Sequence, residues 1–231
     1  MEIDRLAGRY DDLFLISRIG TQRGAVWAVL ADIFQPGYAI LAVNCRMQDA
    51  LFLSLLDVSV VRRDTAEGMI HVDHRRGAMF DGALSNFTGL NSVVDLNQAA
   101  CELASLVSRS APVVVCVSSR FCLSETLWFL FHAKFREAFR RSYGIATVRQ
   151  GDRAVKIHYP TSGEIRRAFS PFFIMRSCTG IGVAVPPSYL EPVFRKYPRV
   201  VCLLRLIENG ICHVPLLRRM GNHMLLHFER V

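Results

Sequence analysis

Lysine is scarce in this chain of 231 residues, because Lys134, Lys156 and Lys196 are the only lysines among 28 basic residues. The net charge of +8 therefore comes from arginines, which are scattered along the chain in pairs. Nucleic-acid-binding faces concentrate basic residues in a patch or stripe, often with interleaved aromatic residues. The scattered distribution argues against a nucleic-acid partner.

The sequence also lacks paired cysteines and a long apolar run. Its seven cysteines include no CxxC pair and lie mostly inside apolar stretches, as Cys116 does, which is typical of buried reduced thiols. The N-terminus opens with Glu2, Asp4 and Arg5 and carries no apolar segment of the signal-peptide kind. No stretch of about 18 apolar residues is present to form a transmembrane helix. We expect a soluble, cytoplasmic protein.

Short β-rich apolar runs alternate with helical patterns along the chain. This alternation is typical of an α/β protein with a mainly parallel sheet and helices on its faces. Strands are predicted at Tyr38 to Asn44, Val58 to Arg62, Met79 to Ser85, Pro112 to Ser118, Phe172 to Cys178 and His223 to Glu229. Helices are predicted at Thr21 to Phe34, Asp49 to Leu56, Thr65 to Arg75, Asp95 to Val107, Leu123 to Arg141, Ser162 to Phe169 and Ser188 to Ile207.

Nothing in the composition divides the chain, since it contains no internal repeat, low-complexity tract or Pro/Gly/Ser-rich linker. We therefore expect a single domain over residues 1–231. The segment from Gly144 to Tyr159 reads as a hairpin that turns at Gly151 and Asp152. Together with the apolar helix before it, this hairpin predicts an inserted cap at about residues 120–160.

Ligands of such sheets bind beyond the carboxyl ends of the strands, where the strand order reverses. The exit loop of the first strand is therefore the first place to look for a site. It runs from Asn44 to Asp49 and leads directly into the next predicted helix.

Four stretches, in this order, carry a family resemblance. They are Arg5 to Asp11 with Tyr10 inside it, Ile40 to Cys45 ending a strand, Asp64 followed by Thr65 to Ile70, and Phe80 to Phe87. In this order and spacing they resemble the class I S-adenosylmethionine-dependent methyltransferases, over about Asp4 to Phe228. The four stretches are similar to the family's N-terminal helix, first strand, ribose-binding acidic residue, and fourth strand with the loop beneath the methyl donor.

The resemblance implies a Rossmann-like methyltransferase fold with an antiparallel last strand, and S-adenosylmethionine as cofactor. It implies methyl transfer to a small, largely apolar acceptor, a reaction that needs no universal catalytic residue. The implied cofactor-binding residues are Tyr10, Asn44, Asp49 and Asp64. The implied substrate-binding residues are Ser85, Asn86, Phe87 and Trp128.

The sequence departs from the family in three places. Arg46, Met47 and Gln48 stand where a glycine turn lets the backbone approach the cofactor, Ala42 replaces a first-strand carboxylate, and the third-strand region before Phe80 is short. These departures motivate a second hypothesis, a methyltransferase fold without the cofactor. Such a protein would be a cofactor-independent cyclase or isomerase, or a non-catalytic partner of another protein.

The segment from Phe121 to Phe139 is apolar on most of its circumference and has basic residues at its end. Three interpretations are open: a helix buried in the core, a lid over a lipophilic substrate, or a contact with a membrane surface. A homo-oligomer is also compatible with the sequence. In the family, insertions after the fifth strand shape the acceptor pocket, which favours the lid over the membrane contact.

Two other groups of residues are weaker candidates for a metal site or a nucleophile. His71, Asp73 and His74 could supply metal ligands on one helix face, but the sequence shows no further ligand, and a charged helix end explains them equally. Ser85, Ser118 and Ser119 end apolar strands as nucleophiles would, yet no Gly-x-Ser-x-Gly elbow frames them. We assign no metal site and no hydrolase chemistry.

Overall fold

The computed structural model describes residues 22–63, 79–87, 89–150, 153–187, 190, 194 and 196–231. Tyr10, Asp64, the helix predicted at Thr65 to Arg75 and the histidines at 71 and 74 lie outside the described residues.

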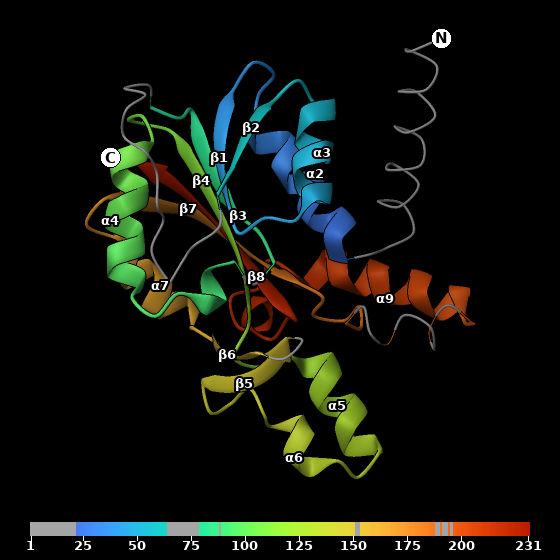
Figure 1. The fold of residues 1–231 in the computed structure, drawn as a ribbon. Helices are drawn as coiled ribbons and strands as arrows, with labels where there is room; N and C mark the ends of the chain where they lie inside the picture. The colour runs from blue at the N-terminus through green and yellow to red at the C-terminus, as the bar shows by residue number, and fades with distance from the viewer. Residues whose placement is uncertain are drawn as a thin grey trace.

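A six-stranded sheet forms the centre of the described part (Figure 1), in the order β2-β1-β3-β4-β8-β7. Its strands are β1 (Ala39–Val43), β2 (Ser59–Arg63), β3 (Gly82–Ser85), β4 (Pro112–Ser118), β7 (Phe173–Ile181) and β8 (His223–Arg230). The first four are parallel to one another, whereas β8 lies antiparallel between β4 and β7. The mainly parallel sheet with an antiparallel last strand is confirmed.

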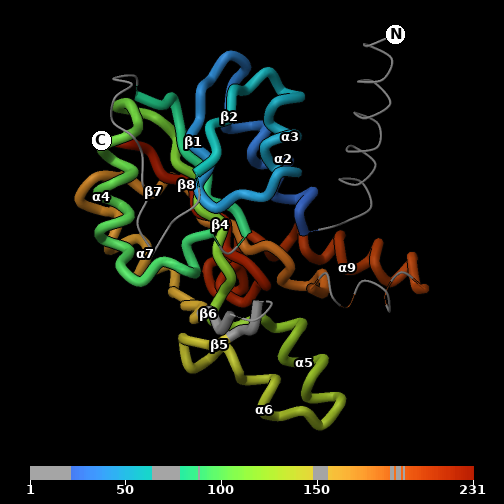
Figure 2. Tube along the Cα trace, in the orientation of Figure 1, coloured from blue at the N-terminus to red at the C-terminus, as the bar shows by residue number. Residues whose placement is uncertain are grey.

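Helices cover both faces of the sheet, and a separate apolar core lies under each pair (Figures 1 and 2). On one face α2 (Gln22–Ile33) and α3 (Met47–Leu55) pack through Trp27, Leu30 and Leu53. On the other face α4 (Leu96–Leu106) and α7 (Ser162–Phe169) pack through Leu103, Ile165 and Phe169. The central strands are buried from both sides, which is why they read as continuous apolar runs in the sequence.

Helix starts follow the local capping chemistry. The Asp95 side chain accepts hydrogen bonds from the backbone N–H of Asn97 and Gln98 at the start of α4, so Asp95 is the N-cap of this helix. At the start of α7, Thr161 and Glu164 form a reciprocal capping box. Both caps lie in the sequence immediately before an amphipathic pattern, so both helices begin within one residue of their predicted positions.

The segment between β4 and α7 forms a lobe outside the main sheet. It contains α5 (Leu123–Phe131), α6 (Phe135–Ala138) and a separate antiparallel pair, β5 (Ile145–Gln150) with β6 (Arg153–His158). The hairpin predicted between Gly144 and Tyr159 is confirmed. The continuous helix predicted from Leu123 to Arg141 is wrong, because the chain turns after Phe131 and Ala133 takes a positive φ of 54°.

The last helix also differs from its prediction. α9 (Pro198–Ile211) begins with a proline, whose missing N–H suits the first helical turn, and ends four residues beyond the predicted Ile207. Short 3₁₀ turns, η1 (Leu90–Ser92) and η3 (Leu217–Arg219), complete the described elements. No helix in the described ranges is long and apolar enough to cross a membrane.

Candidate functional site

The carboxyl ends of β1 and β3 meet at one edge of the sheet, where a ligand would bind in this architecture. Asn44 follows β1 with a φ of 52°, and Phe87 comes two residues after β3 with a φ of 44°. The Asn44 side chain donates a 3.0 Å hydrogen bond to the carbonyl of Gly89, so it connects the two strand ends. Left-handed backbone at non-glycine residues is uncommon and gathers at functional sites.

Buried polar atoms without a hydrogen-bond partner gather at the same edge. They are Ser85 Oγ, both polar atoms of the Asn86 side chain and, after β4, Ser119 Oγ. Asn86 and Ser119 are completely buried, and Ser85 is nearly so. Native proteins satisfy more than about nine tenths of buried polar groups, so a cluster of exceptions needs an explanation such as a bound molecule.

Asp49 lies in the first turn of α3 and is completely buried. Its Oδ1 atom accepts a 2.9 Å hydrogen bond from the indole N–H of Trp27 and forms a 3.3 Å ion pair with Arg23. Arg23 in turn places its guanidinium 4.9 Å from the centre of the Phe87 ring. Asp49 therefore holds α2 and α3 together and orients the Arg23 guanidinium toward the ring of Phe87.

The three residues before Asp49 all lie at the surface. Arg46, Met47 and Gln48 are exposed, and Met47 Sδ lies 3.7 Å from a guanidinium nitrogen of Arg62. The Arg62 Nε atom donates a 3.2 Å hydrogen bond to the carbonyl of Cys45. Arg46 precedes α3 and makes no side-chain cap. The Arg46 side chain therefore satisfies none of the free backbone N–H groups at the start of α3.

His223 begins β8 beside the same edge. Its Nδ1 atom lies 3.4 Å from Ser118 Oγ, and its ring meets Phe87 edge-on with 5.0 Å between centroids. Removal from water, together with the nearby positive charges of Arg141 and Arg46, lowers the pKa of His223 to about 3. The imidazole is therefore neutral at physiological pH and can both donate and accept a hydrogen bond.

Two thiols lie beneath the site and are unreactive. Burial raises the pKa of Cys45 and of Cys116 to about 12. A thiolate is the reactive form of cysteine, so neither side chain can act as a nucleophile near neutral pH. They fill space as small apolar groups.

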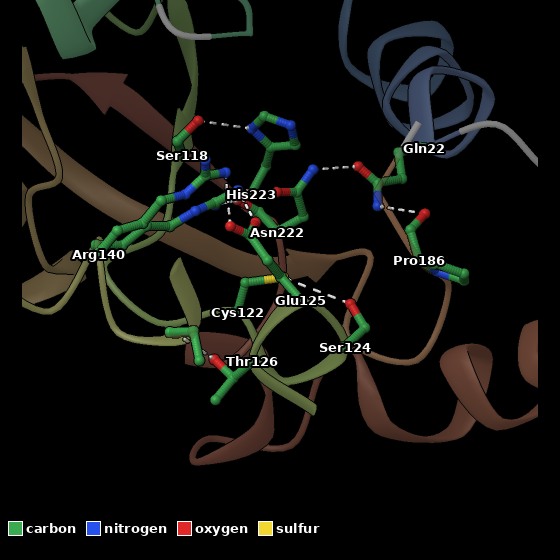
Figure 3. Close-up of polar contacts among 12 residues, drawn as sticks. Gln22, Ser118, Cys122, Ser124, Glu125, Thr126, Arg140, Pro186, Asn222 and His223 are labelled. Atoms are coloured by element: carbon green, nitrogen blue, oxygen red, sulfur yellow. Dashed lines mark hydrogen bonds and ion pairs between the residues drawn. The ribbon is translucent and has the colours of Figure 1, made fainter. Parts of the chain in front are cut away.

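A polar network borders the site on the side of the lobe (Figure 3). Gln22 donates 3.1 Å hydrogen bonds to the carbonyls of Val185 and Pro186, and its Oε1 accepts a 2.6 Å bond from the Asn222 amide. Asn222 accepts a 2.9 Å bond from Arg141, which also pairs with the buried Glu125 of α5. The network joins α2, the loop after β7, the start of β8 and the lobe.

Sequence reasoning missed most of this network. One residue of the network could have been suspected from the sequence: Glu125 is a carboxylate inside a mainly apolar segment. In the structure its side chain is 3% exposed and pairs with both Arg140 and Arg141. Buried carboxylates need such partners. Gln22 and Asn222 had no sequence signal, because 200 residues separate them.

Comparisons with known proteins bear on the fold. No protein-family model matches the chain, and no curated protein matches it. A Listeria monocytogenes protein assigned to the S-adenosylmethionine-dependent methyltransferases has a similar structure, with a TM-score of 0.55, 11% identity, and coverage of 89% of this chain and 96% of that one. We base the fold assignment on this structure and on the strand order.

This chain has the class I methyltransferase fold.

Two further solved structures are similar at lower TM-scores. An S-adenosylmethionine-dependent methyltransferase from Mesorhizobium loti has a TM-score of 0.49 and 11% identity, covering 88% of this chain and 97% of that one. A geranyl diphosphate C-methyltransferase from Streptomyces coelicolor A3(2) has a TM-score of 0.46 and 13% identity, covering 90% and 81%.

Within the methyltransferase fold, the described part of the predicted site separates into two groups. Asn44, Ser85, Asn86 and Phe87 lie together at the carboxyl ends of β1 and β3, with Asp49 buried nearby in α3. Trp128 lies in α5, where its ring centroid is 4.4 Å from that of His132, in a tilted arrangement, and 6.0 Å from that of Phe194. The first group belongs to the sheet edge and the second to the lobe.

Proposed function

We propose that this chain is a cytoplasmic S-adenosylmethionine-dependent methyltransferase that acts on a small, largely apolar acceptor. The observation that carries the proposal is the group of unpartnered polar atoms on Ser85 and Asn86. These atoms lie at the edge of the sheet where ligands of this fold class bind. A ligand with hydrogen-bonding groups would satisfy them, whereas an empty site leaves each one with a desolvation penalty.

The residues at this edge fit a cofactor with polar groups. The Asn86 amide offers both a donor and an acceptor, and the Ser85 hydroxyl offers one of each. Met47 and Gln48 are exposed at the start of α3, where backbone N–H groups suit a carboxylate. In this proposal Asn44 keeps the loop in its left-handed shape, and Asp49 acts by positioning Arg23. Tyr10 and Asp64 complete the cofactor site, as the family resemblance implies.

When bound, S-adenosylmethionine supplies a methyl group on a positively charged sulfur. This chain's part is to position the acceptor in line with that methyl group and to keep water away. Phe87 offers an apolar surface between Arg23 and His223. His223, neutral at physiological pH, can hydrogen-bond an acceptor hydroxyl or amine without adding charge to the site. We assign no residue a catalytic role.

The preference for an apolar acceptor rests on the lobe. Trp128, Phe129 and Leu130 are partly buried on α5, and the Glu125–Arg141–Asn222 contacts fasten that helix to the start of β8. In the proposal, residues 120–160 form a cap over the acceptor, and Trp128 contacts it. Such a cap would favour small molecules over macromolecular substrates.

The proposal is tested by calorimetric titration with S-adenosylmethionine and S-adenosylhomocysteine, after mass spectrometry has shown that neither co-purified. We expect micromolar binding by the unchanged protein. The Asn86→Leu variant should bind at least about tenfold more weakly, because it keeps the volume and removes both hydrogen-bonding atoms. Asn97→Leu, at an exposed site on α4, is the matched control and should bind normally.

Asp64→Ala tests the ribose assignment separately. Unchanged affinity in this variant would remove Asp64 from the site while leaving the rest of the proposal intact. If the unchanged protein binds neither ligand at millimolar concentration, the chain is not a methyltransferase and keeps only the fold.

A further inference from the structure

The lobe carries a row of large apolar side chains that face solvent. Leu127, Phe131, Phe135, Phe139 and Tyr143 follow one another at four-residue spacing, and they are 45%, 87%, 64%, 44% and 83% exposed. Leu127 and Phe131 share one face of α5, because residues four apart on a helix are neighbours. The helix ends at Phe131 and α6 begins at Phe135, so these two side chains lie on either side of the turn. Soluble monomers expose contiguous apolar patches of this kind mainly where something binds.

The buried side chains of α5 are polar, in contrast to this row. Glu125 and Thr126 are the buried residues of α5; Glu125 pairs with Arg140 at 2.7 Å and with Arg141, and the Thr126 hydroxyl donates a 3.2 Å hydrogen bond to the carbonyl of Ala138. The usual arrangement of a surface helix is therefore reversed, with charge inside and phenylalanine outside. The segment from Phe121 to Phe139 is therefore not a helix buried in the core, which was one of the three interpretations of its sequence.

The turn between α5 and α6 lies far from the sheet. Figures 1 and 2 show α5 running outward from the sheet edge, with the connection to α6 at the end of the molecule away from β1 and β2. Hydrogen bonds from the N–H groups of His132, Ala133 and Lys134 to carbonyls of α5 hold the turn in shape. Phe131 and Phe135 flank it, so the two exposed rings project from a formed tip.

The charge around the tip selects the partner. Lys134, Arg136 and Arg140 are exposed beside the rings, and residues 131–140, which span the turn, carry three basic side chains and one acidic side chain, a net charge of +2. A second copy of this lobe would bring two such basic rims together. An anionic lipid surface would complement the charge and take up the rings, because basic side chains are attracted to anionic headgroups.

We propose that the tip of the lobe, formed by Phe131 and Phe135 with Lys134 and Arg136, binds the surface of an anionic lipid bilayer. The two rings insert at the boundary between headgroups and acyl chains, and the basic side chains lie among the headgroups. The contact is independent of methyl transfer, since it uses only the outer face of α5 and α6. It places the molecule on a membrane without spanning it.

Co-sedimentation with vesicles tests this binding. The protein should bind vesicles of mixed phosphatidylcholine and phosphatidylglycerol, bind pure phosphatidylcholine vesicles at least about tenfold more weakly, and lose binding as salt rises. The Phe131→Ser/Phe135→Ser variant should bind the mixed vesicles at least about tenfold more weakly. Val94→Ser/Ile174→Ser removes two exposed apolar side chains elsewhere, 77% and 49% exposed, and should bind normally.

Intrinsic fluorescence gives a second readout. Of the two tryptophans, Trp27 is 2% exposed in the core, whereas Trp128 lies one turn before Phe131. Vesicle binding should therefore shift the Trp128 emission to shorter wavelength. The charge-reversal variant Lys134→Glu/Arg136→Glu leaves both rings in place and should lose binding to the anionic vesicles, which keeps the test independent of the phenylalanine variant's folding.

Three results would overturn the proposal. These are no binding to either kind of vesicle, binding that survives both tip variants, or a wild-type dimer that Phe131→Ser/Phe135→Ser converts to a monomer while neither protein binds vesicles. The last result would make the tip an interface between copies of this chain.

Discussion

The side-chain amide of Asn222 donates a 2.6 Å hydrogen bond to Oε1 of Gln22, across 200 residues of sequence. The bond is buried and joins the start of β8 to the first residue of α2. Because Gln22 also bonds the carbonyls of Val185 and Pro186, one side chain fixes the loop after β7 against α2. Several predictions about stability depend on this junction and its neighbours.

Gly182→Ala should destabilise the fold by about 2 kcal/mol or more. Gly182 has a φ of 70°, which disfavours any side chain, and an added Cβ would collide with the Gln22 amide. Gly210→Ala is the matched control, because Gly210 lies inside α9 with nothing within 4 Å of the added carbon. The control should gain about 0.5–1 kcal/mol. Urea unfolding measures both, and equal effects would contradict the account.

Glu208→Ala should cost about 2–3 kcal/mol of unfolding free energy. The Glu208 carboxylate on α9 accepts hydrogen bonds of 3.0, 2.7 and 3.1 Å from the backbone N–H groups of Val183, Ala184 and Val185. Its loss leaves three donors to find other partners and frees α9 from the loop. Thermal unfolding and limited proteolysis at the loop would show this. Glu137→Ala on the exposed surface of α6 should change neither measurement.

Stability should fall as the pH drops below about 6.5. His223 has a pKa of about 3 in the folded chain against 6.5 as a free side chain, so between these values the unfolded chain binds a proton that the folded chain does not. The loss at about pH 5 is up to about 2 kcal/mol relative to neutral pH. His223→Gln should flatten this slope without abolishing it, because the pKa of His227 is lowered as well.

Urea unfolding at about pH 7.5 and about pH 5 measures the effect of His223. His213→Gln, at an exposed position, serves as the control and should keep the wild-type slope. Identical slopes in the two variants would show that His223 is not desolvated as described.

Asn86→Leu should raise the unfolding free energy of the ligand-free protein by about 1 kcal/mol. The Asn86 side chain is completely buried and neither of its polar atoms has a partner, so an apolar side chain of similar size removes a desolvation cost. Together with weakened cofactor binding, a higher melting temperature would show that Asn86 is retained for a ligand. A lower melting temperature would instead indicate that its amide is bonded within the fold.

The sequence predicted the strands well because each was a short apolar run bounded by polar residues. β4 matches its predicted bounds of Pro112 to Ser118, and α7 matches Ser162 to Phe169. The single helix predicted from Leu123 to Arg141 is two helices in the structure. A segment with apolar residues on every side has no periodic pattern that shows where a helix ends. The turn after Phe131 depends on which residues find buried partners, such as Glu125 with Arg140 and Arg141.

The candidate site was predictable where it follows from strand ends. Asn44 was identified because it begins the exit loop of the first strand, where ligands of such sheets bind. Ser85 and Asn86 were assigned to the site because the segment from Phe80 to Phe87 resembles the family's fourth strand and the loop after it. No local pattern indicated that Asp49 would be buried against Trp27 and Arg23, or that His223 would lie beside Phe87. Such pairs depend on how helices pack on the sheet.

The sequence by itself determined the α/β class, the order of the elements and the edge where a ligand would bind, because these follow from local periodicity and from the geometry of parallel strands. Only the tertiary structure decided that Gln22 meets Asn222, that Ser85 and Asn86 keep unpartnered atoms, and that Phe131 and Phe135 face solvent. The physical reason is that burial and partners are properties of packing between distant segments, which no local pattern encodes.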